Sequence, residues 1–461
     1  MTTIPQTHPN VIVFFTDQQR WDCSGLHGNP LDIMPNFDRL ARRGTHLFHS
    51  YTCQPVCGPA RSSLQTGQYA TTTGCWRNGI PLPPEAKTLA HHFKAGGYDT
   101  GYIGKWHLAE TDPVPQDQRG GYDFWLAANT LEMTSEPYHC LVYDNDNRPI
   151  ELPGYRVDAL TDAAIRYVSQ PRTAPFYLFL SFLEPHHQNH LDAYVAPDGC
   201  RERYEGRWTP PDLAALPGNP PDLHRVAGGS AGQHLGSYWG CVKRLDEALG
   251  RLMDALRSTG LADQTIVLFT SDHGCHFKTR NDEYKRSCHD ASIRVPTGFW
   301  GPGLQGRHVE QLVSLVDLPP TLLDAAGLPI PPEMQGRSLL PLLHAVDAAW
   351  PEEVFIQVSE SQVGRAVRTR RWKYGVVAPG KSGWETGFSE LYREEFLYDM
   401  EYDPYEFVNL IGLNSHRDVA DVLKSRLLRR MHEAGEVIPA IEDAPSRPGG
   451  QRRVTEAEAI A

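Results

Sequence analysis

The residues best suited to chemistry lie between Cys53 and Gly67. Within this segment, Cys57, Pro59 and Arg61 form a C-x-P-x-R pattern. Pro59 suits the first turn of a helix and Gly67 suits its end, so we expect Cys57 at or just before a helix N-terminus. The N–H groups and the dipole at such a position favour an anion, and Arg61, one turn further on, would point back toward Cys57. The pattern predicts an anion site there, although a lone cysteine in a cytosolic protein is more often a buried structural thiol.

Polar side chains follow four short apolar runs along the chain. Runs of this length, rich in β-branched and aromatic residues, are typical of buried strands in a mostly parallel sheet. In doubly wound folds, chemistry collects at the carboxyl ends of the strands, so we expect these side chains to meet at one edge. The runs and the residues that follow are Val11–Thr16 with Asp17-Gln18, Asp99–Ile103 with Gly104-Lys105-Trp106-His107, Phe176–Leu183 with Glu184-Pro185-His186-His187, and Thr265–Thr270 with Ser271-Asp272-His273.

Helical patterns lie between these runs. Apolar residues recur at spacings of three and four from Val242 to Leu256 and from Val157 to Val168, and a shorter helix is expected around Leu89 and Phe93. The alternation of strands and helices predicts an α/β fold, with a large doubly wound, mostly parallel sheet flanked by helices. We assign this domain to residues 1–345.

A different pattern begins after Leu343, where residues 346–461 are expected to form a smaller C-terminal α+β subdomain. It would contain an antiparallel sheet, one long helix and, after Pro445, a loose polar tail. Its expected strands and helix are Val354–Val358, Ala366–Thr369, Trp372–Val377 and about Val419 to Glu433.

The segment Gln188–Gly240 is polar and rich in Pro and Gly. A loop of this length is usually functional or disordered. Two interpretations stay open, a lid that helps to set substrate choice and a surface insertion without a role.

The composition excludes several classes of protein. Of the 461 residues, 40% are hydrophobic and 22% are charged, which is typical of a soluble globular chain and not of a disordered, coiled-coil or fibrous one. Lys and Arg total 44 and Asp and Glu total 56, which gives a net charge of −12. Without a basic run, we expect no nucleic-acid partner.

Neither the start of the chain nor its apolar stretches indicate export or membrane insertion. The longest apolar stretch, Phe176–Leu183, is too short to span a bilayer, and no signal peptide is recognised. We therefore expect a cytoplasmic protein. The nine cysteines contain no C-x-x-C pair and predict no disulfide framework, so the eight other than Cys57 are expected to be ordinary thiols.

The segment from Cys57 to Gly67 resembles the signature of the type I, formylglycine-dependent sulfatases of the alkaline phosphatase superfamily. That signature is C/S-x-P-x-R followed by x-x-L-x-T-G, and the chain matches every fixed position. The resemblance implies hydrolysis of an organic sulfate ester, such as a sulfated sugar, with residues 1–345 as the catalytic domain. It extends, in the family's order, over Val11–Arg20, Gly101–His107, Ser181–His186, Val267–Lys285, Arg294-Val295-Pro296 and Leu397–Met400 with Asp403-Pro404.

In this family the cysteine is oxidised by a maturation enzyme to formylglycine, whose hydrate is the nucleophile. The resemblance implies the same for Cys57, with a formylglycine-generating enzyme as a partner and with Arg61 steadying the modified residue. A plain alcohol nucleophile would leave a stable sulfate ester. A gem-diol can instead attack sulfur with one hydroxyl and expel sulfate with the second.

The resemblance also implies one divalent metal ion, held by Asp17, Gln18, the modified Cys57, Asp272 and His273. Oxygen ligands suit Ca²⁺, with Mg²⁺ or Mn²⁺ as alternatives. The ion would polarise the gem-diol and neutralise sulfate oxygens. Many family members have Asp in place of Gln18 and Asn in place of His273. Both departures resemble a branch that includes phosphonate monoester hydrolases, so a phosphonate or phosphodiester hydrolase is the alternative function.

Further roles follow from the family's K-x-H motif, which Lys105 and His107 match. Lys105 would hold a sulfate oxygen, and His107 would contact the nucleophile and act as a base. His186 would lie beside the leaving oxygen, with His187 as a rival for that place. Lys285 would bind sulfate from the opposite side and help to protonate the leaving alcohol.

A third hypothesis is a binding protein that kept the fold without the activity. Such a protein would be expected to have lost Cys57, Lys105 or a metal ligand, and none of them is lost. The expected partner is thus a small anionic sulfated substrate, and a homo-oligomer stays open.

Overall fold

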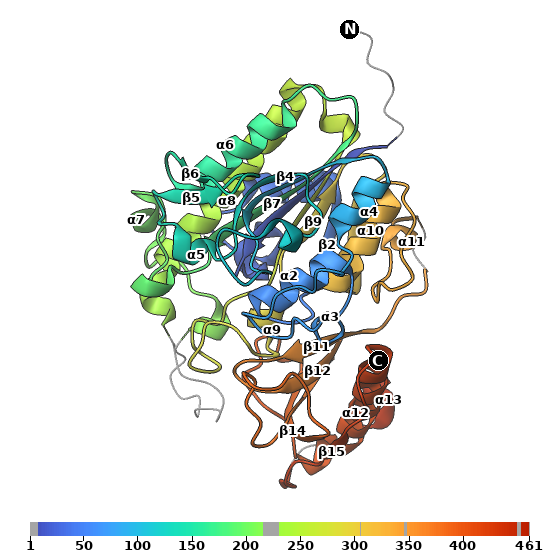
Figure 1. Cartoon of the computed structure of the whole chain (residues 1–461). Helices are drawn as coiled ribbons and strands as arrows, with labels where there is room; N and C mark the ends of the chain where they lie inside the picture. The colour runs from blue at the N-terminus through green and yellow to red at the C-terminus, as the bar shows by residue number, and fades with distance from the viewer. Residues whose placement is uncertain (1–7, 215–229, 305, 345–347, 450–452, 461) are drawn as a thin grey trace.

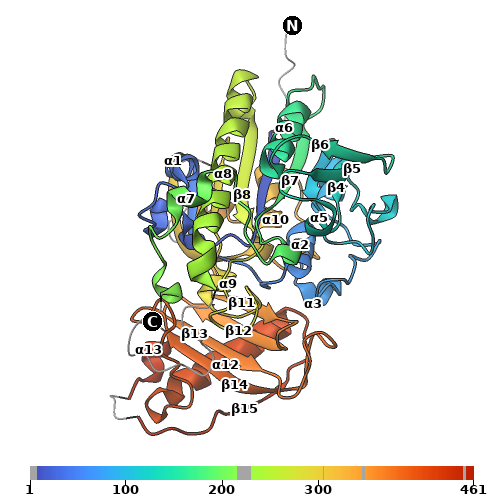
Figure 2. The same cartoon turned by 90° about the vertical axis from the view of Figure 1, so that its left-hand side faces the viewer.

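The computed structural model describes residues 8–214, 230–304, 306–344, 348–449 and 453–460. They form two units, each built on its own β-sheet, and the smaller unit, orange to red, lies directly against the larger one (Figures 1 and 2). The expected boundary between residues 345 and 346 lies outside the described residues and stays a prediction.

The larger unit is built on a ten-stranded mixed sheet. Its strands are β1 (Asn10–Asp17), β2 (Thr45–Tyr51), β3 (Asp99–Lys105), β4 (Phe124–Ala128), β5 (Cys140–Tyr143), β6 (Pro149–Leu152), β7 (Phe176–Pro185), β8 (Thr265–Ser271), β9 (Thr297–Trp300) and β10 (Arg307–Ser314). They lie in the order β10-β2-β9-β8-β1-β7-β3-β4-β5-β6. The four strands expected from the sequence, β8, β1, β7 and β3, are adjacent and parallel. Their carboxyl ends therefore share one edge.

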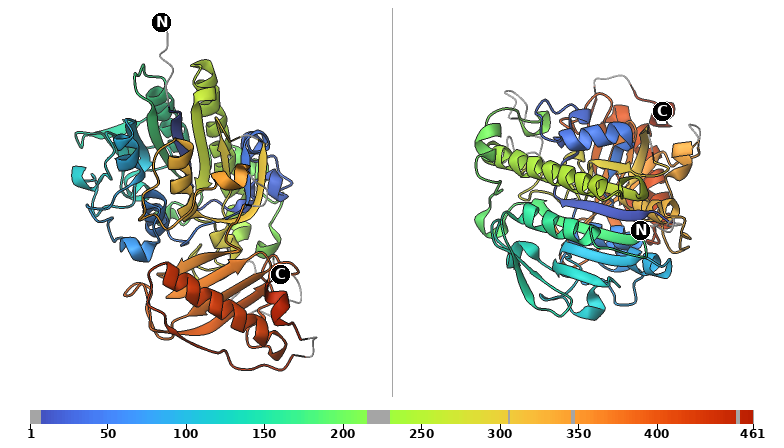
Figure 3. Two further views of the ribbon diagram at one scale, coloured as in Figure 1. Left: turned by 90° about the vertical axis from the view of Figure 1, so that its right-hand side faces the viewer. Right: turned by 90° about the horizontal axis from the view of Figure 1, so that it is seen from above.

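Helices cover both faces of this sheet, and this confirms the doubly wound fold class. They are α1 (Pro35–Arg43), α2 (Cys57–Thr66), α3 (Ala70–Thr73), α4 (Leu89–Ala95), α5 (Leu131–Thr134), α6 (Arg156–Val168), α7 (Cys200–Tyr204), α8 (Ala231–Ser258), α9 (Asp290–Ile293), α10 (Leu318–Ala325) and α11 (Leu340–His344). Side chains of β1 alternate between the faces: Val11, Val13 and Phe15 pack with α2, α4 and α10. Ile12 and Phe14 pack with α1, α6 and α8, which lie side by side in the right panel of Figure 3.

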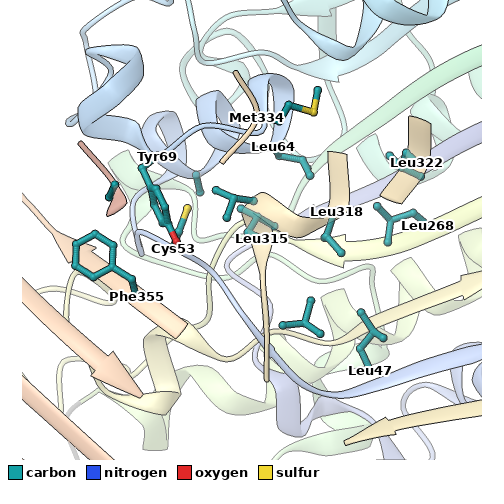
Figure 4. Close-up of a cluster of buried hydrophobic side chains, with 14 of the residues drawn as sticks. Leu47, Cys53, Leu64, Tyr69, Leu268, Leu315, Leu318, Leu322, Met334 and Phe355 are labelled. Atoms are coloured by element: carbon teal, nitrogen blue, oxygen red, sulfur yellow. The ribbon is translucent and has the colours of Figure 1, made fainter. Parts of the chain in front are cut away.

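An apolar cluster joins helix α2, which begins at Cys57, to the rest of the molecule (Figure 4). Leu64 of α2 packs among leucines of β2, β8 and α10. Gly67 ends α2 with φ of 71°, and a Cβ there would lie 2.7 Å from Met334 Cγ, so glycine is required by both conformation and space. Tyr69 continues the cluster to Phe355 of the smaller unit, with 5.4 Å between ring centroids. One core thus runs through both units.

The smaller unit is a five-stranded sheet covered by one long helix (Figure 3, left panel). Its elements are β11 (Glu353–Val358), β12 (Gly364–Thr369), β13 (Trp372–Val377), β14 (Leu391–Asp399), β15 (Ala440–Glu442), α12 (Arg417–Glu433) and α13 (Glu456–Ile460). The first four strands pair antiparallel and β15 joins β14 in parallel. The three expected strands and the expected helix are all present, and the antiparallel C-terminal sheet is confirmed.

The tail after Pro445, expected to be loose, packs back on this unit in its described part. The Val454 N–H donates to the Ser415 carbonyl at 2.8 Å, and Trp372 Nε1 donates to the Glu458 carbonyl at 2.8 Å. The tail is held by hydrogen bonds to and from backbone carbonyls, which any residue can provide, so its polar composition did not predict this packing.

The segment Gln188–Gly240 also differs from the expected loop. Helix α8 begins at Ala231, so the last ten residues of the segment are helical. Gly236 and Gly240 lie against α7, and a Cβ at Gly240 would lie 2.7 Å from Ala196 Cβ. These glycines permit close helix packing where the sequence suggested chain breaks. The lid hypothesis also involves residues 215–229, outside the described residues, and stays a prediction.

Two further sequence expectations concern cysteines and membranes. All nine cysteines are free, and Cys200 is the one that is partly exposed. Within the described ranges, no helix combines the length and the apolar character needed to cross a bilayer.

A buried charged cluster ties the two units together. Lys373 of β13 lies with its Nζ 2.6 Å from Asp290 Oδ1 of α9 and also pairs with Glu406. Glu406 in turn accepts a hydrogen bond from the Asp290 N–H at 2.8 Å. The ammonium group is fully buried, so it neutralises two carboxylates that water cannot reach.

Replacing Lys373 tests how much this buried cation contributes to the free energy of unfolding. Lys373→Ala removes the cation that Asp290 and Glu406 share and leaves Asp290 with the more distant Arg368 at 3.5 Å, so it should lower the free energy of unfolding by about 3 kcal/mol in urea titrations. The control is Arg393→Ala, which removes a half-exposed pair with Glu442 on the same sheet and should cost less than about 1 kcal/mol. Equal losses in the two variants would contradict the assignment.

Candidate active site

The sulfur of Cys57 is the point at which the expected residues converge. Cys57 is the first residue of α2, at the carboxyl edge of the central strands, and is buried. Its Sγ lies 3.5 Å from Asp17 Oδ1 and 3.3 Å from His273 Nε2. Lys285 Nζ donates to the same sulfur at 2.8 Å. Three residues that are distant from Cys57 in the sequence therefore surround its sulfur.

Four side chains around this sulfur, including that of Cys57 itself, form a cluster with the spacing of metal ligands. Asp17, Cys57, Asp272 and His273 are all buried, and each offers a ligand atom within 4.8 Å of the others. His273 Nδ1 lies 2.9 Å from the Gly274 carbonyl. A carbonyl can only accept, so Nδ1 carries the proton, and the lone pair of Nε2 points into the cluster.

Gln18 lies next to the cluster and carries a further oxygen. Its backbone N–H donates to Asp272 Oδ1 at 3.0 Å, and its side-chain Nε2 donates to Tyr194 Oη at 2.9 Å. The remaining atom, Oε1, is buried and has no hydrogen-bond partner among the described residues, although such an acceptor normally costs about 1–3 kcal/mol. Gln18 also adopts φ of 67°, a conformation that is unfavourable for a non-glycine residue. Two carboxylates, an imidazole and a free amide oxygen fit a divalent cation.

The electrostatics of the cluster also favour a bound cation. Burial and the neighbouring Asp17 carboxylate raise the pKa of Asp272 to about 7, an effect that a cation between them would reverse. Burial would also raise the pKa of Cys57, but Lys105 and Lys285 hold it well below its ordinary value. The position of Sγ is therefore suited to an anion.

Arg61 and Lys105 support the cluster from the neighbouring elements. Arg61 Nη2 lies 2.9 Å from Asp17 Oδ2, and Nη1 donates to Ser181 Oγ at 2.7 Å and to the Lys105 carbonyl at 2.9 Å. We expected Arg61 to point back toward Cys57, but its hydrogen bonds go to the carboxylates and the strand ends. Lys105 Nζ lies 2.8 Å from Asp17 Oδ2.

His186 and His187 occupy different surroundings. His186 Nδ1 donates to the His187 carbonyl at 2.6 Å, so its Nε2 accepts from Lys285 Nζ at 3.2 Å. His187 stacks on the outer side of His186, with 4.5 Å between ring centroids, and packs against Tyr284 at 4.4 Å. Of the two, His186 is the one that contacts the lysine bound to Cys57.

His107 lies next to Cys57, and its side chain is hydrogen-bonded to the thiol. Its ring Nδ1 is 3.9 Å from Glu132 Oε1, and the residue adopts φ of 60°. Its side chain is largely buried, and Nδ1 has no hydrogen-bond partner among the described residues.

Three residues of the site were missed by the sequence analysis. Glu132 of α5 lies 3.0 Å from Lys105 Nζ; burial favours its neutral form, but Lys105 and His107 lower its pKa to about 2. No motif surrounds Glu132. Ser181 did carry a signal, because it is a small polar residue within an otherwise apolar run, Phe176–Leu183, of a fully buried strand. The third, Asn78, accepts from the N–H of the residue after Cys57 at 2.8 Å.

The charges of this group nearly cancel. Arg61, Lys105 and Lys285 face the carboxylates of Asp17, Asp272 and Glu132. A divalent cation would make the site positive and suit it to stabilise a tetrahedral anion during transfer.

Comparison with known proteins gives consistent results. A family model described as Sulfatase matches residues 9–328, and one described as N-sulphoglucosamine sulphohydrolase, C-terminal, matches residues 282–433. The ulvan-active sulfatase of Formosa agariphila is 30% identical over 450 residues, covering 93% of this chain and 82% of that protein.

Two solved structures share the fold. The candidate sulfatase yidJ of Bacteroides fragilis has a TM-score of 0.80 at 24% identity, covering 95% of this chain and 98% of that one. BT4656, solved with its substrate D-glucosamine-2-N,6-O-disulfate, has a TM-score of 0.75 at 22% identity, covering 93% and 98%.

Metal binding can be tested without a substrate. Asp272→Ala removes a carboxylate ligand and should weaken binding of Ca²⁺, Mg²⁺ or Mn²⁺ by more than the roughly 10–100-fold that loss of a supporting contact costs, as measured by titration calorimetry. The matched control is Asp246→Asn, a buried carboxylate that accepts from the N–H groups of Asn36 and Phe37 away from the site. Unchanged affinity in Asp272→Ala would place the ion elsewhere.

Proposed function

The chain belongs to the sulfatase family, and on that premise we propose that it removes sulfate from a sulfated carbohydrate, using a formylglycine formed from Cys57 and a divalent metal ion held beside it. Its class of activity, hydrolysis of a sulfuric ester, follows from the family. The modified cysteine, the ion and the sugar are the proposal.

One observation carries the proposal: the Cys57 sulfur is surrounded by metal-ligand atoms on one side and by an ammonium group on the other. Asp17 and His273 approach within 3.5 and 3.3 Å, and Lys285 approaches within 2.8 Å. An oxygen nucleophile at this position would lie between a cation and the group that neutralises the transferred sulfuryl oxygens.

The residues proposed to hold the ion are Asp17, Gln18, Asp272, His273 and the modified Cys57. Once bound, a divalent cation supplies Lewis-acid activation of the nucleophile and charge neutralisation. The unpartnered Oε1 of Gln18 and the Nε2 lone pair of His273 support this assignment.

The remaining residues divide into sulfate binding and proton transfer. Lys105 and Lys285 would hold sulfuryl oxygens from two sides, and Arg61 orients Asp17. The ammonium group of Lys285 can only donate, so the Nε2 of His186 that it contacts accepts and is unprotonated in this state. Lys285 is therefore the nearer source of a proton for the leaving alcohol. His107 would act as the base at the nucleophile.

A sulfated carbohydrate is the substrate class best supported by the relatives. The model that matches residues 282–433 is that of an N-sulphoglucosamine sulphohydrolase, and BT4656 takes a disulfated glucosamine as its substrate.

The state of Cys57 can be measured directly. Conversion of the thiol to an aldehyde lowers the mass of the peptide by about 18 Da, and we expect this loss after co-expression with a formylglycine-generating enzyme. Cys53→Ser, four residues away, should retain the loss, and Cys57→Ala should abolish both the loss and the activity. An unmodified Cys57 in fully active protein would exclude the mechanism.

Substrate preference separates the proposal from the phosphonate hydrolase that Gln18 and His273 keep open. We expect kcat/KM for an aryl sulfate to exceed that for an aryl phosphonate ester on one preparation, and a panel of sulfated sugars to include a better substrate than either. A phosphonate preference of about a hundredfold, or 2.7 kcal/mol in transition-state binding, would reverse the assignment.

A further inference from the structure

A tight turn of the smaller unit reaches the active site. The turn between β11 and β12 carries Ser359, Glu360 and Ser361. Gln54 Nε2 donates to Ser359 Oγ at 2.7 Å, and Ser361 Oγ donates to the Arg286 carbonyl at 2.6 Å. Both partners belong to segments of the larger unit that lead to catalytic residues.

Glu360, at the centre of this turn, joins two of these segments through its carboxylate. Oε1 accepts from the Asn78 backbone N–H at 2.7 Å, and Oε2 pairs with the guanidinium of Arg286. The side chain of Glu360 is fully buried, and that of Arg286 is 12% exposed. Glu360 cannot turn to water, and the guanidinium of Arg286 is held from a second side by Glu283 at 2.7 Å.

Each of the two segments ends at the nucleophile. Asn78 Oδ1 accepts from the Gly58 N–H at 2.8 Å, one of the unpaired donors at the start of α2, directly after Cys57. Arg286 follows Lys285, whose Nζ lies 2.8 Å from Cys57 Sγ. One carboxylate of the smaller unit thus holds the chain on both sides of the reacting atom.

The backbone at these positions is held in unfavourable conformations. Glu360 has φ of 65° and Arg286 has φ of 70°, and such residues cost on the order of 1–3 kcal/mol each. The Glu360 N–H donates to the Gly383 carbonyl at 3.0 Å, and a Cβ at Gly383 would lie 2.5 Å from the same nitrogen. Glycine would adopt this backbone conformation at position 360 without strain, but it has no carboxylate. The unfavourable φ of Glu360 therefore occurs where the side chain contacts Arg286 and Asn78.

We propose that Glu360 is a positioning residue for sulfate transfer, acting on Lys285 through Arg286 and on the N-terminus of α2 through Asn78. This inference rests on the proposed function. It assigns to the smaller unit a direct part in the geometry of catalysis.

The test uses two substitutions at Glu360 in the full chain. Glu360→Gln keeps an oxygen acceptor for the Asn78 N–H and removes the charge that holds Arg286, and it should lower kcat/KM by roughly 10–100-fold, since a displacement of 1 Å costs about that much. Glu360→Ala removes both contacts and should lower it further. Arg286→Lys keeps a cation beside the buried Glu360 carboxylate, so its folding risk is low, and loss of the guanidinium geometry should lower kcat/KM by less than Glu360→Gln does.

A matched control separates positioning from stability. Glu394 of β14 is also a buried carboxylate that pairs with an arginine, Arg417, and accepts a backbone N–H, that of Ala444, away from the site. Glu394→Gln should lower the melting temperature about as much as Glu360→Gln and leave kcat/KM at the wild-type value.

Additivity provides the second readout. If Glu360 acts through Lys285, then Glu360→Gln should change kcat/KM by less than threefold in a Lys285→Ala background. Full additivity, or wild-type activity in Glu360→Gln, would overturn the positioning role. A wild-type enzyme that is folded, carries formylglycine and hydrolyses no sulfate ester would instead overturn the proposed function.

Discussion

The close approach of two buried carboxylates, Asp17 and Asp272, is the constraint around which the molecule is organised. Adjacent parallel strands β1 and β8 bring them together, because Thr16 pairs in register with Ser271. Two negative charges without water are tolerated only beside cations. Arg61 comes from α2 and Lys105 from β3 to meet Asp17, so helix and strands must converge on this edge. The same charges make the edge a ligand set for a divalent ion.

The sequence predicted this convergence because strand-end residues are local signals. Each of the four apolar runs carries its polar residues directly after it, and a parallel sheet must bring such ends together. The strands that were missed lack that signal. β2, with His46 and His49 among its seven residues, has no apolar run, and β9 is only four residues long. The fold class could therefore be predicted from the apolar runs of the central strands, whereas the strands nearer the edges gave no such signal.

Residues that act through tertiary contacts left no signal in the sequence. Glu132 and Glu360 are carboxylates in segments without a motif, and only packing shows that they meet Lys105 and Arg286. Gly236 and Gly240 led to a different error, because they were counted as part of a long loop. Glycine usually disfavours helices, but here it allows α7 and α8 to touch. The family resemblance supplied the expected metal ligands, whereas the proton on His273 Nδ1 and the Gln18 oxygen without a partner among the described residues required geometry.

The contact between Glu360 and the segments flanking Cys57 has a consequence for the timing of synthesis. Glu360 leaves the ribosome about 300 residues after Cys57, which at normal elongation rates corresponds to roughly 15–60 s. During that interval, Lys285 and then the β11–β12 turn have yet to enclose the start of α2. If Cys57 is modified as proposed, the modifying enzyme has a period of access to the sulfur that is set by the rate of translation and ends when the smaller unit docks.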